Sequence, residues 1–380
     1  MEEMNDRLHF KLLNFRQTQW TDWVRSRKPF SVLFELTPSC NMNCVHCYLQ
    51  NVHSSSQLSF EEVTQILDIL YDKSILFLVL SGGEILSRPD FAEIYMYAKR
   101  KGFLIELFSN GLGFNDSIIE MLKKYPPLYV DITLYGSCES TYCKVTRVKG
   151  AFDKVIDNLH RLKDAGIHLS LRTPVMNETV HEMDAMKAIA DELDVPFICT
   201  FEMCPTIDSS TEPQNHQVSM KTMLKYEFDN YLDEVKRNVR TDEVPSPELL
   251  KSFENNYVFS CNAGQNSFVI DYHGNMCPCM KLKHRGKKLN ADNYDEIWES
   301  FGVYGQMKAS ASYKCSKCSA RYYCDVCPAE MDMMYHDYEY RSEEICRPAK
   351  LRKEFYFKER TYDEIINNVQ KGEDDGVQEA

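Results

Sequence analysis

The sequence predicts an α/β protein: a partial (β/α)6 barrel followed by a small cysteine-rich domain of loops and hairpins. Two observations carry this prediction. From Phe30 to about Cys204, short apolar runs typical of strands alternate with stretches typical of helices, a pattern that indicates βαβ units around a parallel sheet. Beyond residue 256, eight of the fifteen cysteines lie between residues 261 and 346. An open barrel of this kind has a lateral mouth wide enough for a large substrate.

The elements of the barrel follow in order along the chain. Strands are expected at residues 31–36, 75–80, 104–108, 129–134, 167–173 and 197–203. Helices are expected between them, near residues 59–73, 90–101, 116–124, 151–165 and 179–193. Six strand-like runs fit the six units of the partial barrel.

Five segments make up the predicted domain organisation. Residues 1–29 are expected to form an N-terminal strap and residues 30–205 the barrel. Residues 206–255 read as a polar bridge with one helix near 219–237, because Pro213, Pro245 and Pro247 break it repeatedly. Residues 256–350 form the cysteine-rich domain, and residues 351–380 a C-terminal helix and flexible tail.

Composition narrows the class of protein. The chain has 380 residues and a net charge of −13, so a nucleic-acid partner is not expected. No apolar run approaches the roughly 18 residues of a membrane helix, and the acidic N-terminus does not resemble a signal peptide. Fifteen cysteines without secretory features indicate metal in a reducing compartment, and therefore a cytoplasmic protein. Four outlying cysteines read as ordinary thiols: Cys138, Cys143, Cys199 and Cys204.

Three cysteines directly follow the first expected strand. Cys40, Cys44 and Cys47 lie on a loop after the run 31–36, which Pro38 ends. Barrels of this class gather their chemistry at the carboxyl ends of strands. A [4Fe–4S] cube normally takes one cysteine at each iron, so three thiolates leave one iron open to a small molecule. A zinc knuckle lacking one ligand, or three buried free thiols, are the alternatives.

This motif, Cys-x3-Cys-x2-Cys followed by the aromatic Tyr48, resembles that of the radical S-adenosylmethionine (SAM) enzymes. The resemblance implies a TIM-like partial barrel in which SAM chelates the open iron through its amino and carboxylate groups. It also implies that the reduced cluster splits SAM to a 5′-deoxyadenosyl radical.

Polar residues after the second and third strands are candidates for the SAM site. The resemblance implies that Gly82, Gly83 and Glu84 line the site of the SAM amino group, and two glycines allow close backbone approach. Ser109 and Asn110 are expected to offer a hydroxyl and an amide to the ribose, although Ser-Asn-Gly also reads as a plain turn.

Later strands contribute further candidates. Thr133 alternates with apolar neighbours and should point into the barrel. Arg172, inside a strand, needs an anionic partner, which the resemblance identifies as the SAM carboxylate; a structural pair with Asp131 or Glu106 is the alternative. His46 lies between two of the motif cysteines, where it is expected either to pack on adenine or to be an ordinary loop residue.

The second cysteine array resembles the SPASM extension, which binds two auxiliary [4Fe–4S] clusters in some radical SAM enzymes. The family pattern has an x3 step where this chain has x2 between Cys324 and Cys327, and this chain adds Cys277. The resemblance assigns auxiliary cluster I to Cys261, Cys279 and Cys327, with Cys277 or an open iron as the fourth position. It assigns auxiliary cluster II to Cys315, Cys318, Cys324 and Cys346. Cys-x2-Cys pairs are also common in zinc ribbons.

With three clusters and SAM as cofactors, the resemblance implies a peptide maturase. Its product is expected to be a modified ribosomal precursor peptide, with a thioether or carbon–carbon crosslink. The expected partners are that peptide, a low-potential flavodoxin or ferredoxin and a separate peptide-recognition protein.

Two alternatives remain open for the function. A sulfatase-maturating enzyme, which forms formylglycine, carries an Asp after the cysteine that matches Cys279, whereas this chain has Met280, which accepts no proton. A ferredoxin-like carrier or a zinc-binding protein is the non-enzymatic alternative, but it gives the Gly-Gly-Glu motif no role. The sequence identifies no general base.

Overall fold

The computed structural model describes residues 27–50, 56–236, 257–259, 261 and 263–367. Most of the predicted N-terminal strap lies outside these residues, and so do the second half of the predicted bridge and the tail after residue 367. The predictions for those segments therefore stay predictions.

Six parallel strands form the barrel sheet, as the sequence predicts. They lie side by side in chain order, from β1 to β6. All six are short, and β1 to β5 are mostly buried, because apolar residues on both faces pack under helices or into the barrel. The edge strand β6 has no fully buried residue. The strands are β1 (Ser31–Glu35), β2 (Phe77–Ser81), β3 (Leu104–Ser109), β4 (Tyr129–Thr133), β5 (Leu169–Pro174) and β6 (Phe197–Thr200).

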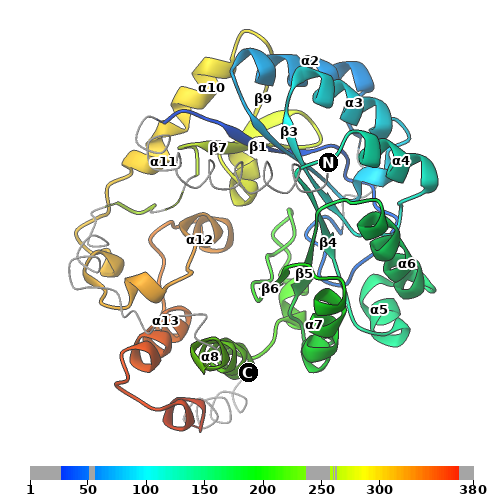
Figure 1. Ribbon diagram of the computed structural model, residues 1–380. Coiled ribbons are helices and arrows are strands. Elements are labelled where there is room, and N and C mark those ends of the chain that lie inside the picture. Colours follow the sequence, from blue (N-terminus) through cyan, green and yellow to red (C-terminus); the bar gives the residue numbers. More distant parts are fainter. Residues whose placement is uncertain (1–26, 51–55, 237–256, 260, 262, 368–380) are drawn as a thin grey trace. The chain divides into compact units, whose positions relative to one another are not determined.

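Helices cover the outer face of this sheet (Figure 1). The five predicted ones are present, and the first begins with a capping box, in which Ser59 and Glu62 each bond the other's backbone N–H. The helices are α2 (Phe60–Asp72), α3 (Phe91–Lys101), α4 (Asp116–Lys124), α6 (Ala151–Asp164) and α7 (Met183–Glu192). An additional helix, α5 (Glu139–Thr146), was not predicted. Its β-branched residues, among them Thr141, Val145 and Thr146, are only moderate helix formers.

The sheet continues past β1 into the cysteine-rich region. Strand β7 (Ser267–Ile270) pairs with β1 in parallel, with Val32 opposite Phe268. A hairpin then leads to β8 (Asn275–Cys277), and β9 (Lys287–Lys288) pairs with β8. The hairpin turns at Gly274, whose φ of +79° is one that glycine adopts without strain. The pairing of β7 with β1 was not predicted.

Backbone contacts divide the chain into two compact units. The first is Met1–Gln217 with Cys261–Gly305, and the second is Val218–Ser260 with Gln306–Ala380. These limits differ from the predicted domains, which placed residues 256–350 together. The physical reason is the pairing of β7 with β1, which makes Cys261–Gly305 part of the barrel unit together with α10 (Tyr294–Ser300) and most of α11 (Gly302–Gln306).

The second unit has a small apolar core of its own. Phe228 of α8 (Met220–Lys236) stacks on Phe355 of α13 (Glu343–Tyr356), with ring centroids 3.8 Å apart. Arg352 of α13 donates to both carboxylate oxygens of Glu227 on α8. A shorter helix, α12 (Pro328–Tyr335), follows Cys327.

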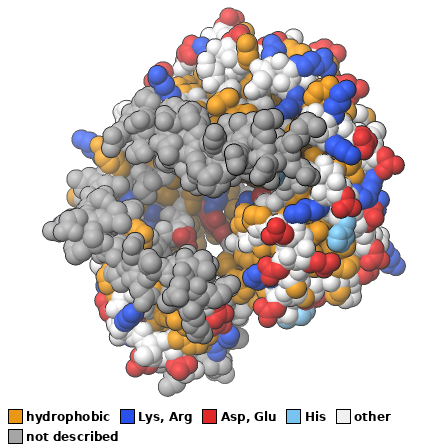
Figure 2. Space-filling model, viewed as in Figure 1, with side chains coloured by type: hydrophobic (Ala, Val, Ile, Leu, Met, Phe, Trp, Pro, Cys, Tyr) orange, Lys and Arg blue, Asp and Glu red, His pale blue; other side chains and the backbone are white. Residues whose placement is uncertain are grey.

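The surface carries charges of both signs. Figure 2 shows acidic and basic side chains interspersed over the face that carries helices α5 to α7. Among the residues that the structure describes, no helix combines the length and the apolar character needed to cross a membrane.

Candidate functional site

The loop Cys40–Tyr48 leaves the carboxyl end of β1 and is held by the unpredicted helix α5. The backbone N–H groups of Asn43 and Val45 donate to the carbonyls of Thr146 and Val145, each at 3.0 Å. Val45 and Val145 also pack together in a small apolar cluster. Helix α5 therefore fixes the path of the loop that carries the three thiols.

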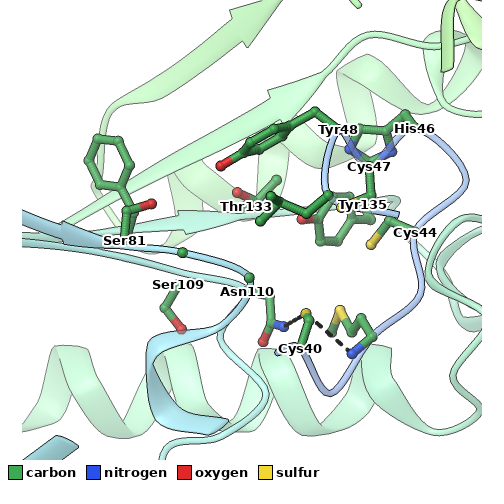
Figure 3. Close-up of a pocket in the computed structure, with 15 residues that line it drawn as sticks. Cys40, Cys44, His46, Cys47, Tyr48, Ser81, Ser109, Asn110, Thr133 and Tyr135 are labelled. Atoms are coloured by element: carbon green, nitrogen blue, oxygen red, sulfur yellow. Dashed lines mark hydrogen bonds between the residues drawn. The ribbon is translucent and has the colours of Figure 1, made fainter. Parts of the chain in front are cut away.

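A cavity of about 200 Å³ opens at this loop. Figure 3 shows its walls: the motif loop on one side, and the ends of β3 and β4 on the others. Predicted residues that line it are Cys40, Cys44, His46, Cys47, Gly82, Gly83, Ser109, Asn110 and Thr133. The sequence analysis did not assign Met42, Tyr48, Leu49, Ser81, Phe108 and Tyr135 to the lining. Of these, Tyr135 could have been predicted from the sequence, because it lies two residues after Thr133 and its side chain is therefore expected on the same side of an extended chain.

The three thiols lie close enough to influence one another. Burial raises the pKa of Cys40 to about 12, and the neighbouring Glu84 and Cys47 add to the rise. The pKa of Cys44 is raised by burial and by Cys47 and Cys40, and that of Cys47 is raised by burial. Sulfurs in such a place become thiolates when iron supplies positive charge, so the trio fits a cluster site.

No set of three or more His, Cys, Asp or Glu side chains among the described residues is arranged around a single metal ion. A [4Fe–4S] cube distributes its cysteines over separate irons, so a cube places different demands on the spacing of its ligands.

Gly82 and Gly83 allow the end of β2 to touch the backbone that precedes Cys40. The N–H of Gly83 donates to the carbonyl of Thr37 at 2.7 Å. A Cβ on Gly82 would lie 2.4 Å from that carbonyl oxygen, and a Cβ on Gly83 would lie 2.4 Å from the carbonyl oxygen of Ser39. The two glycines are thus required by close packing, whatever their contact with SAM.

Glu84 ties the ends of β2 and β3 together. Its carboxylate accepts from the backbone N–H of Leu86 and of Asn110 and from the hydroxyl of Ser109, at 3.0, 2.7 and 2.9 Å. Burial raises its pKa, although these three donors oppose the rise. Asn110 donates in turn to Asn41 at 2.7 Å and to the sulfur of Cys40 at 3.6 Å. The ribose contact predicted for Ser109 and Asn110 stays a prediction.

His46 and Thr133 both face the cavity. The His46 ring lies 5.5 Å from the ring of Tyr135, between centroids. Burial lowers its pKa to about 4, with a further contribution from His216 and an opposing one from Glu178, so the ring is neutral. A neutral, half-buried ring is suited to pack on a flat apolar group.

Arg172 has the partner that the sequence analysis gave as its structural alternative. Its guanidinium contacts both carboxylate oxygens of Asp131, at 2.9 and 3.3 Å. It also lies 5.5 Å from the ring centroid of Phe108, which lines the cavity. Arg172 itself does not line the cavity as the described residues form it, so its contact with a SAM carboxylate stays a prediction.

A buried charged group that the sequence analysis missed lies behind Tyr48. The phenol donates to Glu35 at 2.7 Å, and Lys283 donates to both oxygens of Glu35 at 2.6 Å. Lys283 also lies 5.0 Å from the ring centroid of Tyr48. The Glu35 side chain is fully buried and that of Lys283 is 10% exposed. Tyr48 is therefore held in the cavity wall by an ion pair.

The cysteines of the second array belong to both units. Cys261, Cys277 and Cys279 are in the barrel unit, and the other five are in the second unit. Cluster I, predicted from Cys261, Cys279 and Cys327, therefore stays a prediction. The buried thiol of Cys277 donates to the carbonyls of Asn275 and Lys283, at 3.5 and 3.8 Å, and burial raises its pKa.

Met280 and Asp271, the two residues that the sequence offered for comparison with sulfatase-maturating enzymes, lie in different elements. Met280 begins the 3-10 helix Met280–Arg285. Asp271 accepts from the backbone N–H of His273 and of Asn275, at 2.9 and 2.8 Å, and so belongs to the hairpin turn.

Four thiols of the second unit interact electrostatically with one another. Burial raises the pKa of Cys324, and Cys315 and Cys346 raise it further. The pKa of Cys346 is raised by burial and then by Cys315 and Cys318. These are the four cysteines predicted for cluster II, and their mutual repulsion as thiolates would be relieved by shared iron.

Comparison with known proteins agrees with this geometry. Residues 34–189 match the model of the radical SAM superfamily. Among solved structures, Streptococcus suis SuiB bound to precursor peptide SuiA superposes with a TM-score of 0.65 at 14% identity, over 89% of this chain and 81% of that chain. At this identity the likeness shows the fold alone, and it confirms the partial barrel.

Curated relatives differ in what they act on. Fe-coproporphyrin III synthase of Methanosarcina barkeri is 32% identical over 47% of this chain. The subtilosin biosynthesis protein AlbA of Bacillus subtilis is 25% identical over 74% of this chain. The chain spans 45% of the length of the first relative and 62% of the length of the second.

Proposed function

We propose that this chain is a radical SAM enzyme that modifies a ribosomally made precursor peptide, because residues 34–189 match the model of the radical SAM superfamily. The observation that carries the proposal is the cavity in which three thiols of one loop meet the carboxyl ends of β2, β3 and β4. Cys40, Cys44 and Cys47 would hold a [4Fe–4S] cluster there, and that cluster together with SAM would supply the radical chemistry needed to abstract hydrogen from a substrate.

The chain's own residues would bind the cluster, orient SAM and exclude water from the cavity. Cys40, Cys44 and Cys47 would each hold one iron. Gly82 and Gly83 carry no side chain, so the backbone can approach the place where the SAM amino group is expected. Phe108 and Tyr135 give the cavity apolar walls, which limit the water that could quench a radical. Tyr48 is held in place by Glu35 and Lys283.

A peptide substrate has two supports. AlbA, whose name assigns it to the biosynthesis of the bacteriocin subtilosin, matches about three quarters of this chain. The second support is the cysteine array, which resembles the extension found in enzymes that modify peptides. The finer product, a thioether or a carbon–carbon crosslink, is part of the proposal.

The proposal includes two auxiliary clusters and further partners. Cluster II is the better supported, because its four thiols lie within electrostatic range of one another. A low-potential flavodoxin or ferredoxin would supply electrons, and a separate recognition protein would present the peptide. The fifteen cysteines suit an anaerobic, cytoplasmic setting.

The test is anaerobic co-expression with the small open reading frames encoded beside the gene, followed by mass spectrometry of each peptide. The expected result is a peptide that has lost hydrogen, and 5′-deoxyadenosine when the purified enzyme is supplied with SAM and dithionite. A variant with Cys40, Cys44 and Cys47 replaced by Ala should give neither. Unmodified peptides together with an iron-loaded enzyme that does not cleave SAM would contradict the proposal.

A tetrapyrrole is the second candidate substrate, because the relative with 32% identity is an Fe-coproporphyrin III synthase. Incubation of the same iron-loaded enzyme with an extract of cellular tetrapyrroles distinguishes the two, and Fe-coproporphyrin III is sought as the product, because a synthase forms the compound for which it is named. A porphyrin of changed mass, with the peptides unchanged, would favour this second function.

A further inference from the structure

Arg341 makes an unusual contact with one of the cluster II cysteines. Its Nε–H donates to the sulfur of Cys315 at 3.1 Å. The remaining donors of the guanidinium bond the carbonyls of Tyr338 and Tyr340, at 3.3 and 2.5 Å, and the phenol oxygen of Tyr313, at 2.7 Å. The planar group is therefore fixed on several sides, with its Nε–H directed at the sulfur.

The charge of this arginine has no carboxylate partner among the ion pairs of the described residues. A protonated thiol is a weak hydrogen-bond acceptor, whereas an anionic sulfur accepts a charge-assisted bond of about twice the usual strength. The contact of Arg341 with Cys315 is thus the one expected of a sulfur that carries negative charge, as an iron-bound thiolate does.

We propose that Arg341 is a positioning residue that raises the reduction potential of auxiliary cluster II through its hydrogen bond to Cys315. This inference rests on the proposed function, in which Cys315, Cys318, Cys324 and Cys346 hold that cluster. Hydrogen bonds to ligand sulfurs and the local charge are among the factors that set the potential of such clusters.

The direction follows from charge. A cluster that accepts one electron gains one negative charge, and a fixed positive charge at 3.1 Å from a ligand sulfur stabilises the reduced form more than the oxidised form. Cluster II then becomes the better acceptor for the electron that leaves the substrate radical when that radical is oxidised to product. Arginine suits this role because its charge is permanent and its donors are fixed in a plane.

The test is an EPR-monitored redox titration of the full chain, reconstituted anaerobically, with Cys40, Cys44 and Cys47 replaced by Ala so that only auxiliary clusters contribute. In this background Arg341→Met should keep its iron. The equilibrium constant for one-electron reduction of one cluster should fall about tenfold, so the reduction potential of that cluster should fall by about 59 mV. Arg341→Lys, which keeps the charge but not the planar group, should give a smaller shift.

Arg321→Met is the matched control, because Arg321 donates to the backbone carbonyl of the same Cys315, at 3.1 Å, and not to its sulfur. It removes a charge but no bond to sulfur, so it should lower the potential by clearly less than Arg341→Met does. Unchanged potentials in iron-loaded Arg341→Met would overturn the inference. Loss of iron from both Arg341 variants, but not from Arg321→Met, would show a purely structural role and would also overturn it.

One further variant separates this inference from the proposed function. Cys315→Ala in the same background should lose the iron and the EPR signal of one cluster. If the variant retains the iron and the EPR signal, Cys315 is not a ligand of cluster II as the proposed function requires. The inferred role of Arg341 would then be wrong as well.

Discussion

Gly83 is the residue at which the barrel touches the motif loop most closely. Gly83→Ala places a Cβ 2.4 and 2.5 Å from the carbonyl oxygens of Ser39 and Pro38, and neither backbone atom can move aside without moving Cys40. We expect a loss of about 1–3 kcal/mol in the free energy of unfolding, measured by urea denaturation, together with lower iron content after reconstitution.

Gly102→Ala is the control for this substitution. Gly102 has a φ of +93°, and its added Cβ would meet nothing within 4 Å. It should cost about 1 kcal/mol through backbone strain and leave iron content unchanged. Equal iron content in both variants would show that the close approach at Gly83 does not position the cysteine loop.

Lys283 neutralises a carboxylate that has no access to water. Lys283→Met leaves Glu35 with Tyr48 as its one remaining side-chain donor within the described part of the chain, so we expect a loss of about 3–5 kcal/mol in unfolding free energy. The double variant Glu35→Leu/Lys283→Met removes both charges and should recover much of this loss. A double variant as unstable as the single one would contradict the assigned cause.

At the scale of elements, helix α5 supports the motif loop. Val145→Ala removes apolar contact with Val45 and should cost about 1–3 kcal/mol. The equally buried Val63 of α2 is the matched control, and Val63→Ala should cost a similar amount. Only Val145→Ala should shorten the lifetime of the cluster in air, measured by the decay of its visible absorbance. Equal decay rates in both variants would show that α5 does not support the motif loop.

The elements also show how far sequence reasoning reached. The six barrel strands were predictable because each is a compact apolar run, and most of the cavity followed because parallel strands bring their carboxyl ends to one edge. Helix α5 was missed because it is short and rich in β-branched residues. The contact between Glu35 and Lys283 joins residues 248 positions apart, and nothing in the pattern of either segment indicates the other.

At the scale of the whole molecule, we expect the two units to depend on iron to different extents. The barrel unit has a continuous buried sheet. In contrast, only Tyr313 and Ala320 are buried between residues 313 and 327, so this segment has little apolar core and would be ordered mainly by metal.

Removal of iron by a chelator should therefore loosen one unit selectively. In hydrogen–deuterium exchange, amides between Cys315 and Cys327 should exchange much faster in the iron-free protein. Amides of β2 to β5 should keep their protection. Uniform loss of protection in both units would contradict this division.

The pairing of β7 with β1 has a consequence for the design of truncated variants of the protein. A fragment that stops before residue 256 would leave the donors and acceptors on one side of β1 without the neighbour that now covers them. An exposed edge strand of this kind can pair with the edge strand of another molecule and so cause aggregation. A minimal fragment that keeps the barrel should thus retain the chain through Gly305, because Cys261–Gly305 belongs to the same compact unit as the barrel.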